Sequence, residues 1–63
     1  MKQLVWGTEY DDSECYFVGE RTEGDLNLFK LCVCVNEEVA HEIAIALAAR
    51  DGFPVVREDA ADR

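Results

Sequence analysis

The sequence predicts an α+β fold in which a three-stranded antiparallel meander packs against one helix, a βββα order. Three observations lead to this prediction. The first half of the chain alternates aromatic and β-branched stretches with short polar turns, the pattern of strands joined by tight connections. An alanine-rich stretch with capping residues at both ends follows. The chain has only 63 residues, so all these elements must share one core.

Residues 3–10, 15–21 and 26–35 are the three predicted strands, separated by the polar residues 11–14 and 22–25. The third strand differs from the others because it is apolar on both faces, apart from one asparagine and one lysine. This pattern is typical of a central strand that is covered on both sides.

Residues 37–51 form the predicted helix. Asn36 precedes it as an N-cap, Gly52 follows it at the left-handed exit position, and Pro54 blocks its continuation. At 100° per residue, one stripe of the helix should pack on the sheet. That stripe consists of Val39, Ile43, Ala46 and Leu47, with Ala40 at its edge.

Residues 53–57 can add a short fourth strand, which Pro54 restricts to an edge or to a strand start. We therefore expect residues 1–57 to form a single α+β domain. Residues 58–63 are expected to be a charged C-terminal tail.

One helix covers one face of a sheet, yet the third strand is apolar on both faces. Ile45 and Ala48 also fall on the side of the predicted helix that faces away from its packing stripe. A homodimer or a binding partner could cover this surface, with Ile45 and Ala48 in the contact. Alternatively, a strongly coiled sheet could close over its own second face.

The chain carries fourteen acidic and six basic residues, a formal net charge of −8. Nucleic acid and anionic lipid would be repelled, so we expect neither as a direct partner. The acidic residues of the first two turns and the neighbouring strands are expected to form a rim that binds a basic protein surface, with an aromatic anchor from the first strand. The rim comprises Glu9, Asp11, Asp12, Glu14, Glu20, Glu23 and Asp25, and the anchor is Trp6 or Tyr10.

In size and charge the chain resembles small acidic proteins that phages encode as inhibitors, among them anti-CRISPR proteins and other nucleic-acid mimics. The features that carry this resemblance are the acidic residues between positions 9 and 25, the pair Glu37 and Glu38, and the short meander plus helix. The resemblance implies an inhibitor that occupies the nucleic-acid groove of a host defence effector.

Two functions therefore stay open. The first is a non-catalytic acidic inhibitor of a basic, nucleic-acid-binding surface in a host complex. The alternative is a small dimerising interaction module, or an antitoxin-like subunit, that uses its apolar sheet and helix surface. Association with a basic partner should be fast and should weaken with salt.

We expect neither an enzyme nor a cofactor or metal site. Cys15, Cys32, Cys34 and His41 could be combined into a Cys3His zinc set, but their spacing differs from that of zinc knuckles. In apolar strands these thiols should have raised pKa values and weak reactivity. The odd number of cysteines and the lack of a signal peptide or an apolar membrane span favour the cytoplasm.

Overall fold

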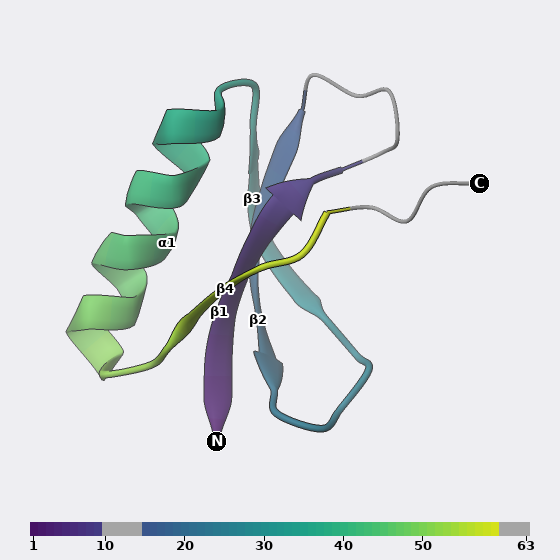
Figure 1. Cartoon of the computed structure of the whole chain (residues 1–63), viewed down its shortest axis with the longest axis vertical. Helices are drawn as coiled ribbons and strands as arrows, with labels where there is room; N and C mark the ends of the chain where they lie inside the picture. The colour runs from purple at the N-terminus through teal and green to yellow at the C-terminus, as the bar shows by residue number, and fades with distance from the viewer. Residues whose placement is uncertain (10–14, 60–63) are drawn as a thin grey trace.

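The computed structural model describes residues 1–9 and 15–59 and confirms the predicted α+β fold. A four-stranded mixed sheet packs against one helix, with the short fourth strand in place (Figure 1). The elements, in chain order, are β1 (Lys2–Thr8), β2 (Tyr16–Thr22), β3 (Phe29–Cys34), α1 (Glu37–Asp51) and β4 (Val55–Arg57).

The strand order across the sheet is β3-β2-β1-β4. β2 pairs antiparallel with both β1 and β3, whereas β4 runs parallel to β1. The predicted central position of the third strand is therefore wrong, because β3 forms an edge of the sheet. The physical reason is the crossover: α1 carries the chain from β3 past β2 and β1, so the next strand adds at the far edge.

The helix begins and ends where the sequence predicts. The Asn36 side chain accepts a hydrogen bond from the Val39 backbone N–H at 3.1 Å. At the other end Gly52 has a φ of 74°, and its N–H donates to the Ala48 carbonyl. Both caps satisfy backbone groups that have no partner within the helix.

Three alanines, one turn apart, form the contact line between α1 and the sheet. Ala40, Ala44 and Ala48 are buried against Leu4, Trp6 and Val18, and Ile43 and Leu47 flank them. The predicted stripe is thus partly wrong, because Val39 and Ala46 are exposed. The small alanine side chains let the helix backbone approach the strands, and the larger Ile43 and Leu47 pack along one side of this line. Ala48, expected on the outer side, is only 3% exposed and cannot contribute to a dimer contact.

On the face of the sheet that α1 does not cover, the side chains near the centre are buried by other parts of the same chain. Val5 and Phe17 are buried there, although neither belongs to the cluster beneath the helix. The ammonium group of Lys30 lies 5.9 Å from the centre of the Phe17 ring. Lys30 also pairs with Glu9, and long charged side chains of this kind can cover apolar surface with their stems.

Glu58 and Asp59, which were expected in the charged tail, continue along β1. The Glu58 N–H donates to the Trp6 carbonyl at 2.8 Å, and an Asp59 carboxylate oxygen accepts from the Thr8 N–H at 3.0 Å. The rest of the expected tail lies outside the described residues. No helix in the described part of the chain is long and apolar enough to cross a membrane.

Candidate functional site

Trp6 lies inside the protein and does not form the surface anchor that the sequence predicts. It is 6% exposed. The His41 ring stacks on it at 4.8 Å between ring centres, and the Arg57 guanidinium lies 4.6 Å from its ring. Trp6 thus links β1, α1 and β4, and its burial corrects the predicted role. Tyr10, the other candidate anchor, lies outside the described residues.

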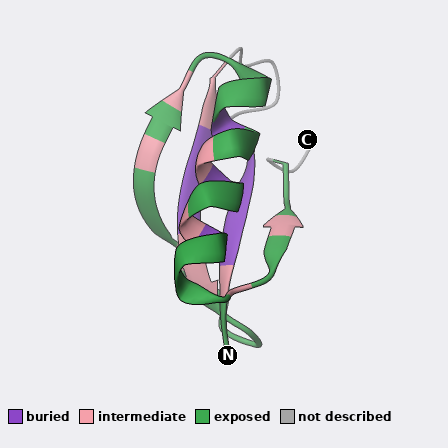
Figure 2. Cartoon of the chain, turned by 90° about the vertical axis from the view of Figure 1, so that its left-hand side faces the viewer, coloured by how far each residue is buried: buried purple, intermediate pink, exposed green. Residues whose placement is uncertain are grey.

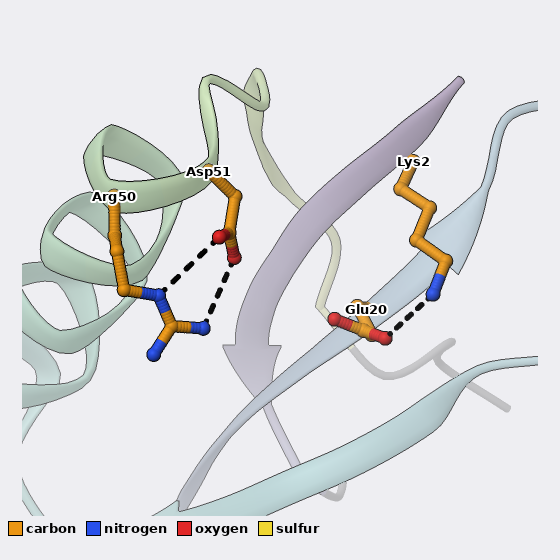
Figure 3. Close-up of polar contacts among 4 residues, drawn as sticks. All are labelled: Lys2, Glu20, Arg50 and Asp51. Atoms are coloured by element: carbon orange, nitrogen blue, oxygen red, sulfur yellow. Dashed lines mark hydrogen bonds and ion pairs between the residues drawn. The ribbon is translucent and has the colours of Figure 1, made fainter.

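The described members of the predicted acidic rim lie in different surroundings. Glu9 pairs with Lys30, and its side chain is only 8% exposed. Glu20 pairs with Lys2 at 3.1 Å (Figure 3). Glu23 and Asp25 are exposed in the β2–β3 connection. Asp11, Asp12 and Glu14 lie outside the described residues.

Within residues 1–9 and 15–59, every lysine and arginine takes part in an ion pair with a carboxylate. Arg50, for example, pairs with Asp51 at 3.1 Å at the end of α1 (Figure 3). The remaining cations are Lys2, Arg21, Lys30 and Arg57. In the same ranges, the carboxylates outside any ion pair are those of Glu23, Asp25, Glu38 and Glu42. Among the described residues, the carboxylates without an ion pair therefore lie in the β2–β3 connection and in the first half of α1.

The cysteines of β3 point toward the core. Cys32 and Cys34 pack against the cluster beneath α1, and no disulfide involves either of them. Burial and the neighbouring Cys32 thiol raise the pKa of Cys34, which confirms the expected direction for this thiol. No three metal-ligating side chains come together among the residues that the structure describes.

Five large apolar side chains on β3 and on the residues that flank it are exposed to solvent. We call this group the β3 strip. It consists of Leu26, Phe29, Leu31, Val33 and Val35, exposed by 94%, 67%, 43%, 56% and 80%. Added together, these exposed fractions correspond to roughly three fully exposed apolar residues. At about 1.5–3 kcal/mol for each fully buried side chain, covering the strip completely would contribute at most about 5–10 kcal/mol before the cost of association.

Position in the sheet explains why these side chains are exposed. β2 occupies one side of β3, and no described strand pairs with the other side. In Figure 2, β3 and β4 lie on opposite sides of α1, and the helix does not cover β3, which is coloured mostly as exposed. The outer backbone N–H and C=O groups of such an edge can pair with another strand.

The β3 strip is nearly free of charge. Residues 26–36 contain no carboxylate, and Lys30 is their only charged residue. Asp25 precedes this segment, and Glu37 and Glu38 follow it. The result is an apolar edge with acidic groups at both ends, and the apolar run in the sequence was the signal that could locate it.

Comparison with known proteins gives no match to a family model, to a curated protein or to a solved structure. The β3 strip and the distribution of charge therefore carry the functional inference.

The ion pair between Arg21 and Glu58 should make stability depend on pH. The Arg21 hydrogen bond lowers the pKa of Glu58, and the two side chains are 2.7 Å apart. A lowered carboxyl pKa adds stability above the unfolded value, near pH 4.3. That stability is lost as the pH falls through the folded value.

We expect Glu58→Gln to unfold at a lower temperature than the parent chain at pH 7 and to match it near pH 2. Thermal unfolding at several pH values, followed by circular dichroism, measures the difference. Glu38→Gln is the matched control because Glu38 forms no ion pair with a described residue. An equal loss in both variants at pH 7 would contradict a specific role for the Arg21 pair.

Proposed function

We propose that this protein is a non-catalytic interaction module that binds another protein chain along the free edge of β3. The observation that carries the proposal is the β3 strip: five apolar residues, each at least 43% exposed, of which three lie in an edge strand and two flank it. Apolar patches on such edges mark association sites, because both the side chains and the backbone gain by being covered.

Strand addition is the mode of binding that suits this surface. A partner strand would satisfy the outer backbone groups of β3, and alternate side chains would then contact the strip. Acidic residues at both ends of the strip keep the free module soluble.

The binding test compares two equivalent lysine substitutions. Val33→Lys places a charge on the β3 edge, which should block strand addition and abolish partner capture from lysate of the native host. Ile45→Lys is the control, because Ile45 is similarly exposed, at 46%, but lies on α1. Circular dichroism should show that both variants fold. If both retain capture, the proposal fails, and if only Ile45→Lys loses it, the outer face of α1 carries the contact.

A second candidate is the acidic inhibitor of a basic, nucleic-acid-binding surface in the host cytoplasm. Its support is the exposed pair Glu23 and Asp25, which form no ion pair with a described residue and directly precede the β3 strip. Glu23→Lys/Asp25→Lys should then abolish capture, and capture by the parent chain should weaken as salt rises. Capture that survives both the double substitution and high salt would exclude this candidate.

A further inference from the structure

Part of β3 pairs with β2 in an uninterrupted register, and the midpoint of that part can be identified. Cys32, Val33 and Cys34 lie opposite three consecutive residues of β2, and the register then shifts so that Leu31 has no partner there. Gly19 accommodates the close approach of the two strands at the shift, because a side-chain carbon at this position would lie 2.6 Å from the Phe29 carbonyl oxygen. The regular part of β3 that follows this bulge is therefore residues 32–34, and its midpoint is Val33.

We propose that this edge binds a second copy of the same chain, with β3 antiparallel to β3 of the copy and a two-fold axis at Val33. The inference rests on the proposed function and names its partner. The two copies would form one continuous eight-stranded sheet with both helices on the same face. Each copy would use the same surface, as two-fold symmetry requires.

Side-chain matching supports this register. Val33 lies opposite Phe17 of its own chain, on the face away from α1, and would meet Val33 of the copy. Cys32 would lie opposite Cys34 of the copy, on the face toward the helices. A two-fold axis at Cys32 would instead place Lys30 opposite Cys34 of the copy. Lys30 lies over Phe17 on the other face, so the bulge disfavours that alternative.

Charge complementarity points to the same register. Antiparallel pairing about Val33 brings Lys30 of one copy toward the end of β3 in the other, where the Glu38 carboxylate forms no ion pair with a described residue. Because the segment from 26 to 36 contains no acidic residue, the pairing brings no two carboxylates directly opposite each other along it.

The opposite edge of the sheet explains why assembly would stop at two copies. β4 has only three residues. Pro54 precedes it, and Arg57 in it pairs with Glu37 and Asp59. Short, charged edges that contain proline resist pairing. Of the two sheet edges in the described part of the chain, only that of β3 is therefore open, and a closed dimer results instead of a filament.

The first measurement is the mass of the native chain by sedimentation equilibrium over a range of concentrations. We expect a reversible change from 7.1 kDa to twice that mass. Val33→Lys should raise the dissociation constant by about 100-fold or more, because two like charges would meet on the axis. Ile45→Lys should leave it unchanged. A parent chain that stays monomeric at every concentration would overturn the inference.

Cysteine cross-linking then tests the register. In a background in which Cys15, Cys32 and Cys34 are replaced by alanine, Val33→Cys should form a disulfide-linked dimer under mild oxidation. Leu31→Cys should not, because the two copies of position 31 would lie about 13 Å apart along the strands. Linkage at both positions would indicate parallel pairing and contradict the proposal, as would linkage of an Ile45→Cys control alone. Circular dichroism confirms folding of each variant.

Salt separates a second copy from a basic partner. Two chains of charge −8 repel each other, so added salt should strengthen self-association. Self-association that weakens with salt would contradict the proposed pairing. If the parent chain is monomeric but Val33→Lys still abolishes capture of another protein, the proposed function stands and only the second-copy inference fails. If Val33→Lys affects neither measurement, both fail.

Discussion

Trp6→Ala is expected to remove a large part of the folding free energy of this protein. Removing a buried tryptophan from a core typically costs about 3–5 kcal/mol. Natural domains are stable by about 0.05–0.15 kcal/mol per residue, which for this chain is roughly 3–9 kcal/mol in total. The loss is therefore comparable with the entire stability, because Trp6 fills the space between β1, α1 and β4 and is stacked by His41.

Circular dichroism and urea denaturation measure this effect. Trp6→Phe should lose less, because a phenylalanine retains an aromatic ring between His41 and Arg57. Phe29→Ala is the surface control, since Phe29 is 67% exposed and should change the stability little. A Trp6→Ala variant as stable as Phe29→Ala would show that Trp6 is not part of the core.

Ala44→Leu should destabilise the protein, whereas Ala46→Leu should be nearly neutral. Both substitutions introduce the same residue into the middle of α1 and differ little in helix propensity. Ala44 is 0% exposed at the contact with the sheet, so the larger side chain must push the helix away at a cost of about 1–3 kcal/mol. Ala46 is exposed and has room for the added atoms.

The thermal midpoints of the two variants provide the comparison. In a domain of this size, about 1 kcal/mol corresponds to a shift of roughly 4–8 °C, so Ala44→Leu should melt clearly below Ala46→Leu. The reverse order would indicate that the helix packs through the stripe containing Ala46, as hydrophobic periodicity alone suggests.

The proposed self-association would also affect the stability of the protein. The cluster beneath α1 has few large side chains, since three of its six buried members are alanines. Small domains often need a further source of stability, such as a metal, a disulfide or a partner subunit. Dimer formation at β3 would supply it, and the unfolding temperature should then rise with protein concentration.

Local sequence determined the elements of this fold. The helix has the predicted bounds because Asn36 and Gly52 act through hydrogen bonds within a few residues. The strands lie where aromatic and β-branched residues cluster, although each differs from the predicted range by one or more residues at its ends. Strand ends depend on pairing with neighbours, which local patterns do not specify.

The packing surface of the helix could not be read from hydrophobicity alone. Periodicity favoured the stripe with the largest apolar residues, but the contact line runs along Ala40, Ala44 and Ala48. Close approach to the sheet requires small side chains there, and this requirement appears only when the two layers are placed together. The same geometry places Trp6 under His41 and Arg57, residues 35 and 51 positions further along the chain.

Charge and the apolar third strand were visible in the sequence, but their roles were decided by the tertiary structure. Glu9 and Glu20 read as members of an acidic surface, yet the folded chain brings Lys30 and Lys2 against them. The run from 26 to 35 read as a covered central strand. The crossover through α1 places β4 at the far edge of the sheet, so no described strand pairs with the outer side of β3. The apolar sequence of a strand predicts that its side chains will be buried. The order of the strands in the sheet determines whether the same chain or another chain buries them.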